Sequence, residues 1–419
     1  MTGAFTGAFT RASLNPYHGA MRDTDAAELA ARRHLVAREV RAAGASAAVF
    51  GTGAHFTALT GTHASSHERL TALVIPAEQP SGASPAVLIA PVTDVAAFRE
   101  APGLAGPDRA GGLDSAANVK VWGWRDGEDP YALVARAVGD AGAAGAAGPT
   151  AATEHGVVEL GASLTAEHVF ALLDQLPGAR PLSPGVLAVF ETKSPAEIAA
   201  LTAAAAAIDK VHAKVPELLR PGRTEENVAR ELARLIEHDH ERVDFVIVGS
   251  GPNGANPHHE FSHRVLREGD PVVVDIGGTA ASGYRSDCTR TYVVSGPDAC
   301  RDESFLRAYA VLQQAQADAV VAARPGITAG ELDAAAREPI EHAGFGEWFT
   351  HRLGHGIGLD THEAPYIVGG SEEVLRESMA FSIEPGIYKP GEWGMRIEDI
   401  VCLGATGARR LNTQPRELR

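Results

Sequence analysis

The first half of the chain alternates short apolar runs with stretches of helical periodicity. The runs with the length and composition of buried strands are Ala47–Phe50, Leu70–Ile75, Val87–Ile89 and Val119–Trp122. The first helical stretch extends from Asp25 to Ala43, and Gly44 is well placed to end it. This alternation predicts a small α/β domain.

A second domain is predicted to begin after Phe190. The segment Ser194–Glu197 combines an N-cap serine, a proline at the first helical position and a capping-box glutamate, so a long alanine-rich helix should follow. Before the first helix, a doubled TGAF motif and weak periodicity predict a flexible tail. We therefore expect a tail over residues 1–23, an N-terminal domain over 24–190 and a second domain over 191–419.

The second domain contains an internal repeat. RPGRTEENVARELARLIEH (220–238) aligns with RPGITAGELDAAAREPIEH (324–342), and LREGDPVVVDIG (266–277) aligns with LRESMAFSIEPG (375–386). The second alignment places an aspartate of the first half over a glutamate of the second. Two halves related by a pseudo-twofold axis, each a helix plus a hairpin, explain these ordered matches better than chance does.

Each half is predicted to hold two carboxylates on a hairpin. If the first hairpin turns at Ala281, Asp275 and Asp287 each lie six residues from the turn. They would then face each other on antiparallel strands, with Cβ atoms about 4.5–5.5 Å apart. Glu384 and Glu398 are each seven residues from the centre of the KPGEWG turn in the second half.

Acidic residues on strands that are otherwise apolar are not expected to face solvent. Two like charges directly opposite each other need a positive charge between them. The nearby arginines Arg285, Arg290 and Arg396 could neutralise one pair, but divalent metal accounts for both pairs. His355, in HRLGHGIGLDTHE (351–363), is the expected fifth ligand because the glycines beside it permit close backbone approach. Four carboxylates and one imidazole favour Mn²⁺ or Co²⁺ over zinc. Two such ions would activate a water and polarise a carbonyl.

The second domain resembles the pita-bread metallopeptidases, which include aminopeptidase P, prolidase, methionine aminopeptidase and the metal-free creatinase. The resemblance rests on the motifs NPHHEFSHR, VVVDIGG, GYRSDCTRT, HRLGHGIGLDTHE, SIEPGIY and MRIED. It implies an α+β catalytic domain with pseudo-twofold duplication, preceded by a smaller α/β domain of the creatinase type. The metal ligands that it implies are Asp275, Asp287, His355, Glu384 and Glu398.

The resemblance also implies roles for individual residues. Asp287 and Glu398 would bridge two metal ions, and Glu384 would help to deprotonate the bridging water. The residues implied to be catalytic are His258, His351, His362, Glu384 and Arg396. The histidines would steady the substrate carbonyl and the tetrahedral intermediate, and the arginine would support the metal-site network.

The implied activity is hydrolysis of the Xaa-Pro bond at peptide N-termini. Some compact prolidases carry an arginine four residues after the histidine equivalent to His362, where it binds the free carboxylate of the proline. This chain has Tyr366 there. We therefore expect a Xaa-Pro aminopeptidase, with a Xaa-Pro dipeptidase as the alternative and a small-molecule amide hydrolase on the same fold as a more remote one. The N-terminal domain disfavours methionine aminopeptidase, and the intact acidic ligands disfavour creatinase.

Two other motifs compete with this interpretation. Residues 249–254 satisfy GxGxxG, but Pro252 and Pro257 remove backbone donors that a dinucleotide would need. Residues 259–263 satisfy the HExxH motif of zinc proteases, but a zinc helix would leave the hairpin acids unexplained. Both matches are expected to be coincidental.

Composition limits the partners. The chain has 419 residues, 45% of them hydrophobic and 21% charged, which is enough for two globular cores. A net charge of -16 disfavours nucleic acid and anionic membranes as partners. Three scattered cysteines form no disulfide framework, and the absence of a signal peptide or membrane-spanning run predicts a cytoplasmic protein. The family resemblance implies a homodimer or homotetramer.

Overall fold

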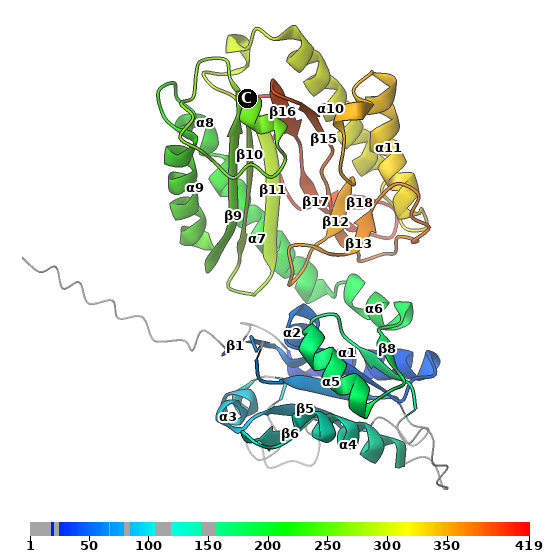
Figure 1. Cartoon of the computed structure of the whole chain (residues 1–419). Helices are drawn as coiled ribbons and strands as arrows, with labels where there is room; N and C mark the ends of the chain where they lie inside the picture. Colours follow the sequence, from blue (N-terminus) through cyan, green and yellow to red (C-terminus); the bar gives the residue numbers. More distant parts are fainter. Residues whose placement is uncertain are drawn as a thin grey trace, which may run out of the picture. The chain divides into compact units, whose positions relative to one another are not determined.

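The structure of the chain, a computed structural model, divides into two units, Met1–Phe190 and Glu191–Arg419 (Figure 1). The residues that it describes are 18–20, 25–66, 68–78, 84–101, 103–104, 119–143 and 156–419. Of the expected tail, residues 1–17 and 21–23 lie outside the described residues. His18–Ala20 form strand β1, which pairs antiparallel with β3 (Thr62–Ala64), so these three residues are paired rather than part of a tail.

The first unit contains a six-stranded sheet in the order β6-β5-β4-β2-β7-β8. Its strands are β2 (Ala47–Gly51), β4 (Ala72–Pro76), β5 (Ala86–Pro91), β6 (Val119–Trp124), β7 (Val158–Leu160) and β8 (Ala179–Pro181). Its helices are α1 (Ala26–Ala42), α2 (Ala54–Thr60), α3 (Val92–Glu100), α4 (Pro130–Ala143), α5 (Ala166–Gln175) and α6 (Pro184–Glu191). The four predicted strands are confirmed, and α1 begins after an Asp25 side-chain cap and ends before Gly44, at φ 70°.

The second unit contains three sheets, in the orders β11-β10-β9, β13-β12-β14-β17-β18 and β15-β16. Its helices are α7 (Pro195–His212), α8 (Val215–Leu218), α9 (Glu225–Asp239), α10 (Glu303–Ala322) and α11 (Ala329–His342). Its strands are β9 (Arg242–Ser250), β10 (Pro271–Thr279), β11 (Arg285–Val293), β12 (Gly354–Gly356), β13 (Glu363–Ile367), β14 (Ala380–Ile383), β15 (Gly386–Lys389), β16 (Trp393–Arg396), β17 (Asp399–Leu403) and β18 (Ala408–Arg410). Figure 1 shows the strands between α7–α9 on one side and α10–α11 on the other.

The predicted repeat is visible in matching backbone contacts of the two halves. Helix α9 is capped by Thr224 and helix α11 by Thr328, each within a capping box. Thr224 forms an isolated bridge with Val265, and Thr328 forms the corresponding bridge with Val374. The two halves therefore attach their helix to their hairpin in the same way. The long helix predicted after Ser194 is confirmed as α7, including its capping box.

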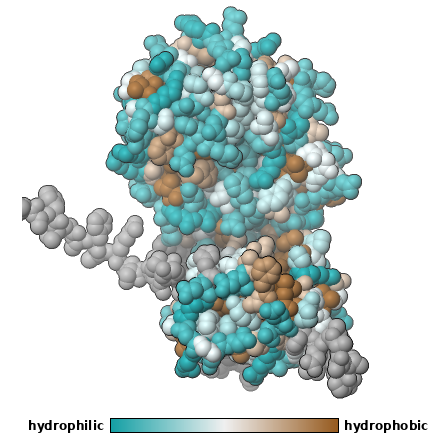
Figure 2. Space-filling view, in the orientation of Figure 1, coloured by the Kyte–Doolittle hydropathy of each residue, from teal (hydrophilic) through white to brown (hydrophobic). Residues whose placement is uncertain are grey.

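Alternation along the β10–β11 hairpin separates a core face from a site face. Val272, Val274 and Ile276 belong to the core that packs against α7 and α9. Because successive side chains of a strand point to opposite faces, Asp275 faces away from that core. Asp287 is likewise on the opposite face from Cys288, a member of the same core. The visible surface of this unit is mainly hydrophilic, with hydrophobic residues in small groups (Figure 2).

Candidate metal centre

The register of the first hairpin differs from the predicted one. Thr279 pairs with Arg285, which centres the turn on Ser282 rather than on Ala281. Asp275 therefore lies opposite Thr289, and Asp287 lies opposite Gly277. A shift of one residue in the turn moves the register by two, so both carboxylates stay on one face but are diagonal neighbours. The prediction that they face each other directly is wrong, and a diagonal separates Cα atoms by about 7–8 Å.

The second hairpin has the predicted centre. Gly386 pairs with Arg396, and Ile383 pairs with Asp399, both symmetric about Gly391. Glu384 and Glu398 occupy the symmetric positions between these two ladders. The backbone N–H of Glu384 donates to the carbonyl of Leu353, and that of Glu398 donates to the carbonyl of Thr289. These bonds hold the second pair of acids against β12 and the first hairpin.

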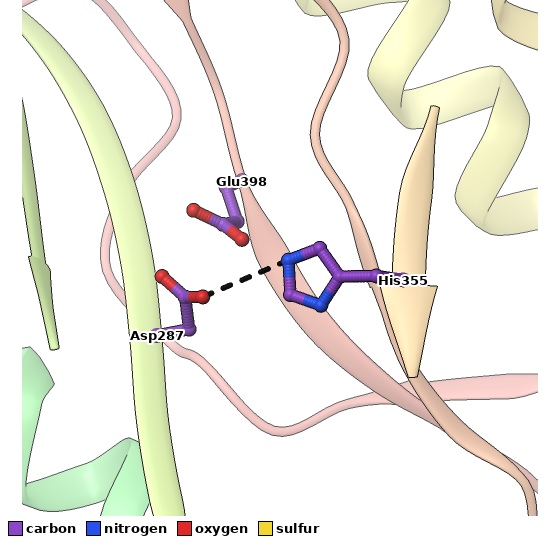
Figure 3. A group of neighbouring side chains, drawn as sticks. All are labelled: Asp287, His355 and Glu398. Carbon is purple, nitrogen blue, oxygen red and sulfur yellow. Dashed lines mark ion pairs between the residues drawn. The ribbon is translucent and has the colours of Figure 1, made fainter. Parts of the chain in front are cut away.

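Asp287, His355 and Glu398 converge at one point between the sheets. Figure 3 shows their side chains, from three different strand regions, directed toward one another. One possible ligand atom from each lies within 4.8 Å of the others, and all three residues are buried. His355 Nδ1–H donates to the carbonyl of Gly356 at 3.1 Å, which leaves the Nε2 lone pair facing the acids. A lone pair aimed at carboxylates needs a cation between them.

The other two predicted ligands border this group. Glu384 Oε1 lies 3.1 Å from His355 Nε2 and accepts the Ser382 hydroxyl at 2.9 Å. Asp275 Oδ2 accepts Arg396 Nη2–H at 2.5 Å. Arg396 thus neutralises one acid of the four. Arg285 instead pairs with Asp244, and Arg290 with Asp399, so local arginines do not account for the acidic cluster.

Two buried oxygen atoms support a metal at this place. Asp275 Oδ1 and Glu398 Oε1 are buried and have no hydrogen-bond partner within the described residues. Burial, followed by repulsion from Glu398 and Asp275, raises the pKa of Asp287 well above its usual value. Burial, followed by repulsion from Glu384 and Asp275, does the same to the pKa of Glu398. Full ionisation of these acids requires additional positive charge, which divalent metal would supply.

The five predicted ligands open onto a pocket of about 1200 Å³. The predicted catalytic residues line the same pocket. Together the predicted site residues found in its wall are His258, Asp275, Asp287, His351, His355, His362, Glu384, Arg396 and Glu398. His258 and Glu398, which are 140 residues apart in the sequence, therefore meet in one cavity.

Comparison with known proteins places this site in a family. Residues 199–405 match metallopeptidase family M24. Over 399 residues the chain is 46% identical to "Probable dipeptidase PepE" of Mycobacterium tuberculosis, covering 95% of this chain and 98% of that protein. It is 36% identical over 309 residues to the Xaa-Pro dipeptidase of Lactobacillus helveticus, covering 72% and 80% of the two chains. The crystal structure of dipeptidase PepE from Mycobacterium ulcerans superposes with a TM-score of 0.83 at 44% identity, covering 96% and 99%.

The chain belongs to metallopeptidase family M24. It is therefore a hydrolase of peptide bonds, and the expected pita-bread α+β fold is confirmed by the solved M24 structure. Within the described residues, no helix has the length and apolar character needed to cross a membrane.

The three additional histidines of this M24 pocket differ in their contacts. His351 Nδ1–H donates to the carbonyl of Arg352 at 2.7 Å, and its Nε2 accepts the Tyr388 hydroxyl at 3.0 Å. Both of its ring nitrogens are thus occupied. The ring nitrogens of His258 and His362 have no hydrogen-bond partner within the described part of the chain. These two imidazoles, rather than His351, are available to a bound substrate.

Burial also sets the charge of the available His362. It lowers the pKa of His362 to about 4, with a further contribution from the neighbouring His355. The two rings meet edge to face with centroids 4.1 Å apart. His362 is therefore neutral at pH 7, with one N–H to donate and one lone pair to accept.

The loop that carries His258 is held by a buried carboxylate. Glu225, at the start of α9, accepts hydrogen bonds from Ser250, Asn253, His259 and Ser262. His259 is therefore a partner of Glu225, and His263 lies 3.0 Å from Glu226. Residues 257–264 are not helical. The HExxH match is thus structural and does not form a zinc helix.

The GxGxxG match is also explained by packing. Gly251–Ala255 form a short 3-10 helix, η2, and no α-helix follows it within the loop. A Cβ atom at Gly394 of β16 would overlap the carbonyl of Gly254, so glycine at 394 permits η2 to approach the strand that ends at Arg396. The glycines around His355 have the same function, since a Cβ at Gly354 would overlap the carbonyl of Ser382.

Three supporting residues were not predicted from the sequence. Tyr388 donates to His351 and accepts Arg396 Nη1–H at 2.7 Å. Thr289 donates to Glu398 at 2.7 Å and accepts Arg396 Nε–H at 3.0 Å. Ser382 accepts the His355 backbone N–H at 2.9 Å. Thr289 and Ser382 each lie two residues from an expected ligand on a strand, and this same-face spacing could have identified them.

Proposed function

We propose that this chain is a two-metal Xaa-Pro dipeptidase, a prolidase. The observation that carries the metallopeptidase chemistry is the convergence of two hairpin acid pairs and His355 in one pocket. The dipeptidase names of relatives that align with most of the chain favour this alternative over the aminopeptidase expected from the sequence. The N-terminal unit would be the creatinase-type domain that accompanies such enzymes.

The metal site would hold two divalent ions, with Mn²⁺ favoured by the oxygen-rich ligand set and Co²⁺ also compatible. The proposed ligands are Asp275, Asp287, His355, Glu384 and Glu398. Asp287 and Glu398 would contact both ions. When bound, the ions would supply an activated water and polarise the scissile carbonyl.

Glu384 is the proposed general base. Its Oε1 accepts the Ser382 hydroxyl at 2.9 Å, and the charges of Arg396 and of bound metal would favour its ionised form. The carboxylate is therefore ionised at neutral pH and can accept a proton from the attacking water. It would then deliver that proton to the prolyl nitrogen as the peptide bond breaks.

The available histidines would stabilise the charge that develops on the carbonyl oxygen. A neutral His362 can donate one N–H to that oxygen, and His258 lines the same pocket. His351 would act indirectly, by orienting the Tyr388 hydroxyl that also contacts Arg396. Homo-oligomer formation and a cytoplasmic location remain predictions.

A Xaa-Pro aminopeptidase is the second candidate, because Tyr366 occupies the position of a carboxylate-binding arginine. We would assay a Xaa-Pro dipeptide, a Xaa-Pro-Xaa tripeptide and a Xaa-Ala control with added Mn²⁺. The proposal expects the dipeptide to be cleaved most efficiently and the Xaa-Ala control poorly. Preferential cleavage of the tripeptide would identify an aminopeptidase. Turnover of a small amide with no cleavage of any peptide would indicate the remote alternative.

A further inference from the structure

Tyr366 lies beside the metal site although it cannot form an ion pair. In the β12–β13 ladder it is the direct partner of His355. Directly opposed residues of antiparallel strands project from the same face of the sheet. The position at which some prolidases carry an arginine is therefore adjacent to a proposed metal ligand in this chain as well.

A cation is present at this position, supplied by a different residue. The guanidinium carbon of Arg352 lies 4.6 Å from the centre of the Tyr366 ring. Arg352 also lines the pocket, next to His351 and three residues before His355. An arginine over the face of an aromatic ring is held by cation–π attraction, and its N–H groups remain free at the edge of the guanidinium plane.

The other arginines of the pocket are already engaged by acids. Arg396 is buried and bonded to Asp275. Arg230 is bonded to Glu226 at 2.7 Å. Arg352 forms no ion pair with any of the described residues. Among the pocket-lining arginines of the described chain, it is the one whose charge is available to a ligand.

The acidic lining of the pocket makes the unpaired charge of Arg352 relevant to substrate binding. Three buried acids and the partly buried Glu384 line it, and an incoming peptide carboxylate would be repelled by any charge that the metals leave uncompensated. A free C-terminal carboxylate therefore needs a cation at the substrate end of the site. The planar guanidinium of arginine can donate two parallel hydrogen bonds to such a carboxylate.

We propose that Arg352, held on the ring of Tyr366, binds the C-terminal carboxylate of a Xaa-Pro dipeptide. The inference rests on the proposed function and adds the residue that limits the substrate to two residues. Tyr366 then supports the carboxylate-binding cation instead of replacing it. A tripeptide places a neutral amide at the same point and gains nothing from Arg352.

The test compares Ala-Pro with Ala-Pro amide, which differ in the charge at that point. Arg352→Met should lower kcat/KM for Ala-Pro about 10- to 100-fold, the usual effect of losing a charged hydrogen bond, and should leave the amide within about threefold. Tyr366→Phe should keep the preference for the acid, and Tyr366→Leu should reduce it. Arg230→Met, on the same pocket wall, is the matched control, and its ratio of acid to amide should equal that of the wild type.

Binding of the product separates this inference from the proposed function. Calorimetry on the Mn²⁺-loaded protein compares L-proline with L-prolinamide and requires no turnover. A preference for proline that Arg352→Met abolishes supports the inference even if neither dipeptide is hydrolysed. Arg352→Gln replaces Arg352→Met if the latter does not fold. Equal losses for acid and amide, or an unchanged preference in both variants, would overturn the inference.

Discussion

Replacing Glu225 with glutamine should show how the loop that carries His258 is held in place. Glu225 is fully buried and accepts seven hydrogen bonds between 2.6 and 3.1 Å from Ser250, Asn253, His259 and Ser262. Burial raises its pKa, but the hydrogen bonds from Ser250, His259 and Ser262 outweigh burial and lower it. The side chain is therefore a carboxylate that organises the whole segment before β10.

The expected loss of stability follows from the hydrogen-bond donors around each carboxylate oxygen of Glu225. Glutamine replaces one oxygen by an NH₂ group, which would face the N–H and hydroxyl of either Ser250 or Ser262. At least two hydrogen bonds to a charged group are then lost, each worth about 1.5–3 kcal/mol. The negative charge in the first turn of α9 contributes about 0.3–1 kcal/mol more. We expect Glu225→Gln to lower the free energy of unfolding by about 3–7 kcal/mol, which is large for a single substitution.

The assay uses urea unfolding, hydrogen exchange of residues 248–264 and turnover of a Xaa-Pro dipeptide. Glu226→Gln is the matched control, because Glu226 is the next residue, is partly exposed and forms surface ion pairs with Arg230 and His263. Such pairs contribute about 0–1 kcal/mol. Glu225→Gln should also speed exchange in the loop and lower kcat/KM at least about tenfold, because His258 loses its fixed position. Equal effects of the two substitutions on stability and exchange would refute the reasoning.

Three further predictions concern the metal, the histidines and pH. A chelator should abolish activity, and Mn²⁺ or Co²⁺ should restore it. Elemental analysis should show that Asp287→Ala has lost bound metal. Turnover by the metal-stripped protein would contradict the metal-dependent mechanism. His258→Ala should lower kcat about 100-fold or more while Glu260→Gln keeps its metal and most activity, and the reverse result would reject the assignment of this loop. Burial and the charge of Arg290 lower the pKa of His212 to about 3, so its contribution to stability is complete above pH 6.5 and is lost as pH falls. In urea unfolding, the free energy of unfolding of the wild type should exceed that of His212→Gln by about 2 kcal/mol less at pH 5 than at pH 6.5. A difference that does not change with pH would exclude the lowered pKa of His212.

The sequence predicted which acids meet in the pocket better than it predicted their mutual geometry. Strand alternation and the repeat place Asp275 and Glu384 on inward faces, whatever the details of the turns. The register depends on the turn itself, where Ala280 N–H donates to Tyr284 and Gly283 N–H to Ala280. A turn-rich segment can form the turn at several positions. The pairing and packing of the flanking strands select one of these positions. The symmetric second hairpin was predictable because Gly391, at φ 74°, is the residue that tolerates its turn.

The cation proposed to select a dipeptide illustrates what the order of residues along the chain does not show. Taken alone, Tyr366 predicts the loss of a cation, because a motif compares one position at a time. The structure places Arg352 over that ring from fourteen residues earlier, across a ladder whose register shifts between His355 and Gly356. That shift sets which side chains of β12 and β13 are neighbours, and no spacing in HRLGHGIGLDTHEAPYI encodes it. A substrate carboxylate requires a positive charge at one place in the pocket. Any segment of the chain that passes this place can supply the charge.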